Sequence, residues 1–241
     1  MKAAEAFAAL AALPECNIET ILAGRRPLIL APHADDESLG CGGFIAACCE
    51  AAAATGLDPI VAVLTDGSKS HPDSRLFPQP RLRDLREAEA FRAVRLLGLP
   101  PENLIFLRYE DTNLPSSGEG LDRAVSRVQR LAREKNCTLL IAPWAHDPHC
   151  DHEAAAAIAS ATGLPVLSYP VWGWLRDADD EVAPPRGGFR LNIAPFLARK
   201  RAAIAAHESQ YGNLIKDSPN GFRLPANLLE IFARPHEIFF E

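Results

Sequence analysis

Residues 28–37 read LILAPHADDE, an apolar run followed at once by a loop that holds a histidine and three carboxylates. A second stretch repeats this order, with LLIA at residues 139–142 and HCDH at residues 149–152. Short apolar runs of this kind are typical of buried strands, and ligands bind beyond the carboxyl ends of parallel strands. The two loops are therefore predicted to converge on one site, although more than a hundred residues separate them.

Apolar runs that fit buried strands alternate with helical patterns along the chain. Strands are predicted at residues 27–32, 59–65, 104–108, 138–143 and 165–171. Helical patterns lie between them at about 40–55, 82–97, 119–135 and 152–161. This alternation predicts an α/β fold of Rossmann-like type, with a mostly parallel sheet and helices on both of its faces.

The chain is expected to form a single domain over residues 1–241, because no linker or repeat divides it. Residues 1–25 are predicted to be a helical N-terminal extension, in which residues 7–13 form an amphipathic helix rather than a signal peptide. Residues 177–188 are polar and rich in proline and glycine, which predicts a surface loop.

The composition argues against several classes of protein. Of the 241 residues, 48% are hydrophobic and 23% are charged, as is usual for globular proteins. The formal net charge of −6 disfavours nucleic acid or an anionic membrane as a partner. No apolar stretch approaches the roughly 20 residues of a membrane span. The six cysteines lack paired Cys-x-x-Cys spacing, so reduced thiols and a cytoplasmic location are expected, and no signal of an oligomeric state is present.

The spacing within the first loop predicts a metal site. His33 and Asp36 are three residues apart, and on a turn that enters a helix both side chains can face one point. Asp35 must then point elsewhere, which divides the adjacent carboxylates into a metal ligand and a general base. Histidine and carboxylate ligands with one open position describe a catalytic zinc site, although iron, manganese or cobalt also suits these donors.

The second loop follows the same logic. His149 and His152 are three residues apart, so the start of a helix would put both on one face. One of these histidines would complete the metal site, while the other would donate a proton or hydrogen bond. Asp151 can reach an imidazole N–H and fix its tautomer. Cys150 is the one cysteine placed to reach this site.

Two simpler readings compete with the metal site. A single histidine at a strand end is more often a structural residue, and the Asp-Asp-Glu run of residues 35–37 could only cap a helix. The capping reading leaves His33 and the second loop unexplained. The glycines of residues 40–43 do not form a dinucleotide fingerprint, and they predict close packing of a helix on the sheet.

At these residues the sequence resembles the PIG-L/LmbE-like family of zinc-dependent N-acetylglucosaminyl de-N-acetylases. That family has Ala/Pro-His-Pro-Asp-Asp-Glu after its first strand and His-Pro-Asp-His after a later one, which here are PHADDE at 32–37 and HCDH at 149–152. Ala34 and Cys150 replace the usual prolines without removing a reacting group. Further similarity lies in LTDG at 64–67, in Arg86 and Glu89, in Leu97-Gly98 and in Asp111.

The resemblance implies a PIG-L/LmbE-like deacetylase fold and assigns roles to the two loops. The metal ligands would be His33, Asp36 and His152, and Asp35 would be the general base. His149, oriented by Asp151, would face the developing oxyanion. Zinc would lower the pKa of water toward ~7, and attack on an acetamide would release acetate and a free amine.

Other residues on the neighbouring loops are candidates for substrate binding. Arg86 is one of them, with an exposed helix arginine paired with Glu89 or Asp84 as the alternative. The other candidates are His71, Asp111, His146 and Asp147. Tyr169, Trp172 and Trp174 could stack on a sugar or pack in the core, and a late helix could close the pocket with Lys200, His207, Ser209 and Gln210.

The expected function is zinc-dependent removal of the acetyl group from an N-acetylated amino sugar or its conjugate. The alternatives are a zinc amidase that acts on a non-sugar amide and a metal-stabilised sugar-binding protein without turnover. The residue pattern does not name the N-acetylated substrate.

Overall fold

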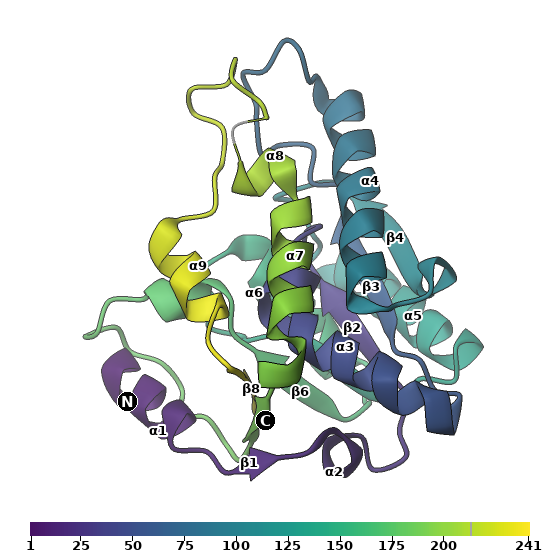
Figure 1. The fold of residues 1–241 in the computed structure, drawn as a ribbon. Helices are drawn as coiled ribbons and strands as arrows, with labels where there is room; N and C mark the ends of the chain where they lie inside the picture. The colour runs from purple at the N-terminus through teal and green to yellow at the C-terminus, as the bar shows by residue number, and fades with distance from the viewer. Residues whose placement is uncertain (213) are drawn as a thin grey trace.

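The computed structural model describes residues 1–212 and 214–241. Across these residues the main sheet has five parallel strands in the order β4-β3-β2-β5-β6 (Figure 1). The strands are β2 (Pro27–Ala31), β3 (Ile60–Thr65), β4 (Leu104–Tyr109), β5 (Leu139–Pro143) and β6 (Val166–Tyr169). Every residue of β2, β3 and β5 is buried, as expected for central strands covered on both faces. The predicted parallel, Rossmann-like sheet is confirmed.

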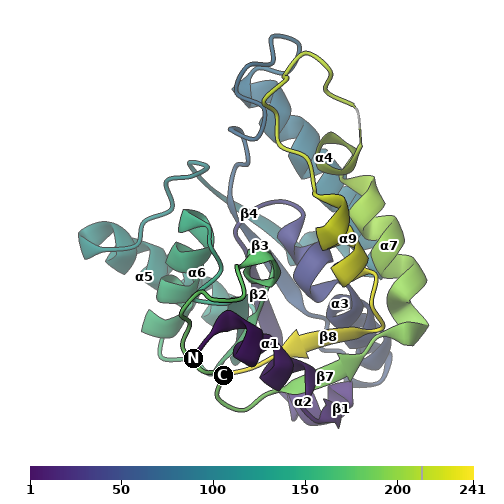
Figure 2. The ribbon, with the colours of Figure 1, turned by 90° about the vertical axis from the view of Figure 1, so that its left-hand side faces the viewer.

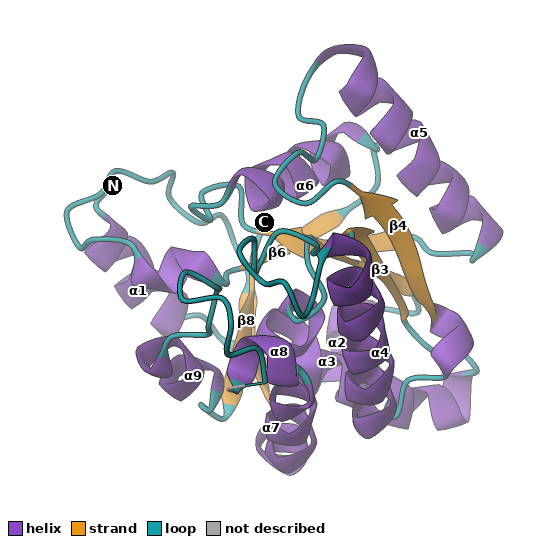
Figure 3. Cartoon of the chain, turned by 90° about the horizontal axis from the view of Figure 1, so that it is seen from above, coloured by secondary structure: helices purple, strands orange, loops and turns teal. Residues whose placement is uncertain are grey.

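Helices cover both faces of this sheet. On one face, α3 (Asp36–Thr55), α4 (Gln79–Leu97) and α7 (Leu197–Ala206) share a hydrophobic core with the strands (Figure 2). On the other face, α5 (Gly118–Glu134) and α6 (Cys150–Ala161) form a second core (Figure 3). The buried side chains of α5 recur at helical spacing, which gives this helix one apolar stripe toward the sheet.

A smaller sheet extends the main one beyond β6. In it, β1 (Glu15–Cys16) pairs in parallel with β7 (Phe189–Asn192), and β7 pairs antiparallel with β8 (His236–Phe239). Phe240, directly after β8, exchanges two backbone hydrogen bonds with Ser168 of β6, which joins the two sheets. The other short elements are α1 (Ala3–Ala11), α2 (Ile18–Leu22), α8 (Glu208–Tyr211), α9 (Ala226–Phe232) and the 3-10 helices η1 (Pro101–Asn103), η2 (Trp172–Leu175) and η3 (Ala194–Phe196).

The predicted strands and helices of the α/β core are present, with shifted ends. The largest shift is at α3, which begins at Asp36 rather than near residue 40, because the carboxylates of the first loop already belong to its first turn. The N-terminal segment 1–25 is not only helical as predicted. It also contains β1, whose pairing with β7 ties this segment to the small sheet.

The glycines of α3 allow close packing, as their sequence position predicted. A Cβ atom at Gly40 would overlap the ring of Tyr169, and one at Gly43 would overlap the side chain of Ile193. A Cβ atom at Gly42 would lie 2.9 Å from Cγ of Lys200. Helix α3 can therefore lie against β6, η3 and α7 only because these positions have no side chains.

A buried ion pair fixes the middle of α3 to the small sheet. Lys200 of α7 donates a 2.7 Å hydrogen bond to Oε1 of Glu237 in β8, and both side chains are almost fully buried. The carboxylate of Glu237 also accepts the backbone N–H groups of Gly43 and Phe44, each at 2.7 Å. Breaking such a pair is costly because it leaves an uncompensated buried charge.

Helix α3 is long and apolar enough, by length and composition, to cross a membrane, which differs from the expectation that no apolar stretch approaches that length. In the fold 67% of its most apolar window is buried, between the sheet, α4 and α7. Packing in the protein core accounts for this composition, since core helices share it with membrane spans.

Replacing Gly40 with alanine is expected to lower the free energy of unfolding by about 1–3 kcal/mol, because the new methyl group overlaps the Tyr169 ring. Urea unfolding of Gly40→Ala measures this loss. In a Tyr169→Leu background the same substitution should cost less, since the colliding ring atoms are absent. An equal cost in both backgrounds would show that this contact does not set the packing distance.

Candidate active site

The two loops predicted to converge lie side by side because β2 and β5 are neighbours in the sheet. Residues 32–35 lead from β2 into α3, and residues 144–149 lead from β5 into α6. The strand order also reverses between β2 and β5, with β3 and β4 on one side and β6 on the other. Ligand sites of open α/β sheets form at such a switch point.

Two histidines and one carboxylate converge between these loops. Oδ2 of Asp36 lies 3.3 Å from Nδ1 of His33 and 3.2 Å from Nε2 of His152. The same oxygen accepts the backbone N–H of His33 at 2.9 Å. His33 and His152 also belong, together with His149, to a group whose nitrogen atoms lie within 4.8 Å of one another. The three residues predicted as metal ligands are thus brought together.

A buried nitrogen of His152 has the character of a metal ligand. Its Nε2 has no hydrogen-bond partner among the described residues, since its approach to Asp36 lacks hydrogen-bond geometry. Its Nδ1 lies 2.8 Å from Oδ2 of Asp147, which fixes the ring and leaves the Nε2 lone pair directed at Asp36 and His33. Carboxylate support of this kind is typical of metal-binding histidines. The residues present therefore fit a divalent cation.

Charge in the site is shared unevenly among the three candidate ligands. Burial lowers the pKa of His152, but Asp36 and Asp147 outweigh this effect and raise it to about 9. Burial raises the pKa of Asp36, but the two histidines hold it well below its usual range. A divalent cation held between these groups would take the place of a proton on His152 and balance the negative charge of Asp36.

His33 has two further carboxylate neighbours. Its Nε2 lies 3.0 Å from Oδ2 of Asp151 and 3.3 Å from Oδ1 of Asp111. Asp151 also accepts the backbone N–H groups of Thr112 and Leu114. The sequence predicts that the Asp151 carboxylate orients His149. In the structure that carboxylate instead contacts His33 and the backbone of the loop after β4.

Asp35 lies at the N-terminus of α3, and its carboxylate does not cap the helix. It occupies the N-cap position, yet its side chain makes no capping hydrogen bond, so helix capping does not explain it. Its φ of 152° is unusual for a residue other than glycine and strains the turn. Burial raises the pKa of Asp35 to about 6, an effect that Arg86 opposes and Asp36 strengthens.

Arg86 of α4 reaches this turn from the neighbouring helix. It is buried, so the alternative of an exposed helix arginine is wrong. Its two terminal nitrogens donate to the carbonyl oxygens of Gly67 and Ala34, and one of them lies 3.4 Å from Oδ2 of Asp35. Arg86 therefore positions the strained turn and compensates the buried charge of Asp35.

His149 begins α6 and faces the first loop. Its Nδ1 accepts the backbone N–H of Asp151, so the neutral ring carries its hydrogen on Nε2. Its ring lies edge-on to His33, with the ring centres 4.7 Å apart. Burial and the positive charge of the neighbouring histidines lower its pKa, which favours this neutral form. His149 is then a hydrogen-bond donor through Nε2.

Another buried histidine supports the first loop. The sequence predicts for it only that it could help a late helix to close the pocket. His207, directly after α7, lies 3.1 Å from Oε1 of Glu37. The other oxygen of Glu37 accepts the backbone N–H of Asp35 at 3.0 Å. The turn at Asp35 is thus tied to α7. The sequence placed Glu37 in the motif but gave no signal that residue 207 would be its partner.

A cavity of about 350 Å³ lies beside these groups at the carboxyl ends of the strands. Its walls come from both loops, the segment after β3, the loop after β4, η2 and the segment around α8. The lining residues are His33, Asp35, Asp36, Lys69, Ser70, Pro72, Arg86, Asp111, Thr112, His149, Trp172, Gln210, Asn220 and Phe222.

The sequence matches the family described as "PIG-L: GlcNAc-PI de-N-acetylase" over residues 28–162, more than half of the chain. The chain belongs to the PIG-L family. The resemblance seen in the two loops is therefore confirmed, and the matched residues run from β2 to the residue after α6.

Individual relatives agree with this PIG-L membership. The chain is 27% identical over 200 residues to a protein of Bacillus anthracis named "Probable N-acetyl-alpha-D-glucosaminyl L-malate deacetylase 2", covering 80% of this chain and 84% of that one. It is 29% identical over 221 residues to the diacetylchitobiose deacetylase of Thermococcus kodakarensis, covering 86% and 78%. An N,N'-diacetylchitobiose deacetylase structure from Pyrococcus horikoshii shares the fold, with a TM-score of 0.64 and 20% identity over 89% of this chain and 82% of that one.

Three residues of this PIG-L protein that were candidates for substrate binding do not line the cavity. His71 is buried against Gly221, and His146 accepts a backbone hydrogen bond from Ala183 away from the cavity. Asp147 is fully buried and accepts backbone N–H groups from residues 171–173 in addition to its contact with His152. The other two candidates, Arg86 and Asp111, do line it.

The three aromatic candidates have three different environments. Trp172 lines the cavity and packs edge-on against Phe222, with ring centres 5.5 Å apart. Tyr169 belongs to the core and donates its hydroxyl to the Leu30 carbonyl. Trp174 lies outside this cavity. No sequence pattern marked Phe222, because it lies in an irregular segment far along the chain.

Of the four candidates on the late helical segment, only Gln210 lies on the cavity wall. Gln210 lines the cavity as expected, whereas His207 and Ser209 are buried behind it and Lys200 belongs to the ion pair with Glu237.

Cys150 is exposed, and its Sγ points toward the Thr112 carbonyl. Its sulfur also lies within 4.8 Å of donor atoms of His149 and Asp151, the one place where a thiol approaches the site in the described part of the chain.

Replacing Asp147 with asparagine is expected to weaken divalent-cation binding by about 10–100-fold, because His152 loses the charged partner that orients its ring. Competition between the protein and a chelator for Zn²⁺ and Co²⁺ measures the affinity. Asp179→Asn, at an exposed acid, should bind as the unaltered protein does. Unchanged affinity in Asp147→Asn would contradict the supporting role of that carboxylate.

Proposed function

We propose that this protein is a metal-dependent N-deacetylase that removes the acetyl group from an N-acetylglucosamine-type amino sugar, with zinc as the metal and Asp35 as the general base. The observation that carries the proposal is the grouping of His33, Asp36 and the buried His152 at a cavity whose wall also contains Asp35 and His149. The named relatives, which are deacetylases of amino-sugar compounds, support the reaction class.

His33, Asp36 and His152 would hold the cation. Two imidazoles and one carboxylate are a donor set of catalytic zinc sites, which keep a position open for water or substrate, and Fe²⁺ suits the same donors. When bound, the cation supplies Lewis-acid chemistry, which lowers the pKa of water toward ~7 and polarises a carbonyl group.

Asp35 would move the proton. In the hydrolysis, a water oxygen bonds to the acetamide carbonyl carbon while Asp35 accepts the proton of that water. The C–N bond then breaks, and Asp35 returns the proton to the nitrogen, so that acetate and a free amine leave. Arg86 of α4 and the carboxylate of Glu37, which His207 contacts in turn, hold the turn of Asp35 throughout.

His149 would stabilise the oxyanion that develops on the acetamide oxygen. Its Nδ1 already accepts a backbone N–H, so Nε2–H is the donor it has to offer. A donor fixed by a helix N-terminus needs no reorganisation as charge develops, which is how such groups contribute to catalysis.

The cavity walls fit a sugar better than a simple acetamide. Trp172 and Phe222 offer an aromatic surface at the same cavity as the candidate catalytic groups. Lys69, Gln210 and Asn220 offer hydrogen-bonding groups for hydroxyls or for the group attached to the sugar. An apolar wall with a few polar groups is typical of small-molecule sites.

Release of primary amine from a panel of N-acetylglucosamine conjugates tests the substrate class. The zinc-loaded protein is expected to act on at least one conjugate and to leave N-methylacetamide intact. Equal turnover of sugar and simple acetamides would favour an amidase that does not recognise a sugar. No turnover of any amide, with one zinc bound per chain, would favour a binding protein.

Asp35→Asn is expected to lower turnover by ~10²–10⁴-fold, since asparagine cannot accept the proton. Cation stoichiometry should stay at the level of the unaltered protein, because residue 35 is not among the proposed ligands. Asparagine also has nearly the size and shape of aspartate, so the buried site can accommodate it. Asp84→Asn, at an exposed acid of α4, is the matched control, and undiminished activity in Asp35→Asn would overturn the assignment.

His149→Ala and His149→Asn are expected to lower kcat by ~10²–10³-fold, the usual cost of one oxyanion donor. The pair separates catalysis from folding, because asparagine can still cap α6 whereas alanine cannot. Thermal unfolding should therefore show a loss of stability in His149→Ala only. Full activity in the stable His149→Asn variant would exclude the oxyanion role.

A further inference from the structure

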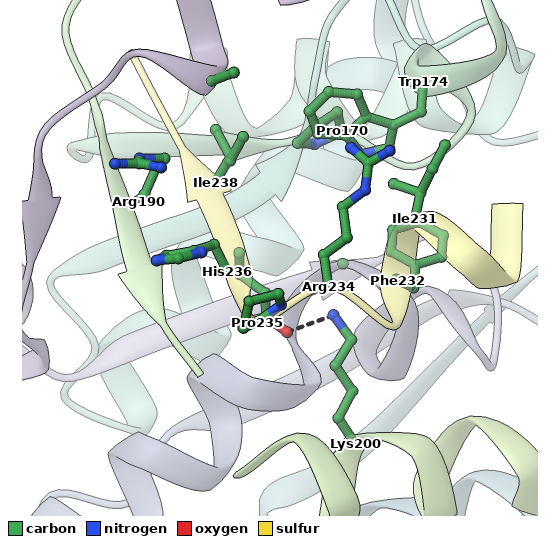
Figure 4. Close-up of a pocket in the computed structure, with 13 residues that line it drawn as sticks. Pro170, Trp174, Arg190, Lys200, Ile231, Phe232, Arg234, Pro235, His236 and Ile238 are labelled. Carbon is green, nitrogen blue, oxygen red and sulfur yellow. Dashed lines mark hydrogen bonds and ion pairs between the residues drawn. The ribbon is translucent and has the colours of Figure 1, made fainter. Parts of the chain in front are cut away.

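A second cavity lies on the other side of η2 from the candidate active site. It has a volume of about 200 Å³ and is bordered by α1, α3, α7, α9 and both long strands of the small sheet (Figure 4). The two cavities share no lining residue among those that the structure describes. Trp172 faces the first cavity and Trp174 faces the second, so a single turn of 3-10 helix separates them.

The walls of this second cavity combine positive charge with apolar surface. Lys200, Arg190 and Arg234 line it, and Glu237 is its one carboxylate among the described residues. Trp174, Phe232, Pro170, Ile231 and Ile238 are among its apolar lining residues. This local excess of cations is notable in a chain whose formal net charge is −6.

The cations retain unused hydrogen-bond donors. The buried Lys200 ammonium has three donors, but within the described residues it makes a single hydrogen bond, to Glu237. Arg190 uses Nε for the Leu13 carbonyl, which leaves its terminal nitrogens available. Arg234 makes no side-chain hydrogen bond in the described structure, and Figure 4 shows it extending toward Trp174 and Pro170.

We infer that this cavity binds a small organic monoanion, namely a carboxylate carried on an aromatic ring. Planar guanidinium groups match a carboxylate in two-point geometry. Glu237 already balances the charge of Lys200, so the guanidinium groups of Arg190 and Arg234 supply the positive charge for an anion. The aromatic and branched walls fit a flat apolar body rather than a bare inorganic ion. The volume of the cavity limits that body to about the size of a single ring.

Binding of 4-fluorobenzoate, followed by ¹⁹F NMR on the purified protein, tests the inference. Binding is expected for 4-fluorobenzoate but not for 4-fluorobenzamide, which has the same ring without the charge. Inorganic phosphate should not displace it at equal concentration. Failure of 4-fluorobenzoate to bind, or equally tight binding of the amide, overturns the inference, and displacement by phosphate overturns its aromatic part.

Variants locate the probe. Arg234→Gln and Arg190→Gln, at positions that are not fully buried, should each weaken binding by about 10–100-fold, as expected for a lost charged hydrogen bond. Trp174→Leu should weaken it as well, whereas Arg133→Gln on the opposite face of the sheet should not. His152→Ala should leave binding unchanged. If His152→Ala abolishes binding while the two arginine variants do not, the probe occupies the candidate active site and the inference is wrong.

Discussion

The parallel pairing of β2 with β5 is the interaction on which the site depends. Residues that are far apart in the chain become neighbours only because these two strands lie next to each other at the point where the strand order reverses. Each strand then delivers one loop and one helix start to the same place. A different strand order with the same elements would keep the hydrophobic core but would separate His33 and Asp36 from His152.

Buried charge is the second constraint, because an unpaired ionised group in the interior is costly. The structure meets it by giving the acids of the two loops partners from other elements. Asp151 accepts two backbone N–H groups from the loop after β4, Asp147 accepts those of η2, and Glu37 pairs with His207. The partners that satisfy these charges also fix the loops in place, so the same contacts serve stability and geometry.

The sequence predicted those features that short-range patterns determine. Apolar runs identified the central strands, and the spacing of His33 to Asp36 identified residues that do meet. Partners from distant segments were not predictable in this way. Asp147 was a candidate for substrate contact, but the conformation of the loop turns it toward His152 and the backbone of η2. Phe222 and His207 reach the site through tertiary packing of irregular segments, which leaves no periodic pattern in the sequence.

Glu237 has a consequence for the order in which the chain can assemble. Its carboxylate serves the backbone of α3 and the ammonium of Lys200, yet it lies 194 residues after Gly43. During synthesis from the N-terminus, α3 and α7 are complete before this acid exists, and until then the Lys200 ammonium has no carboxylate to meet in the interior. The helix that begins at the turn of Asp35 can therefore complete its polar contacts with α7 and the small sheet only when β8 docks.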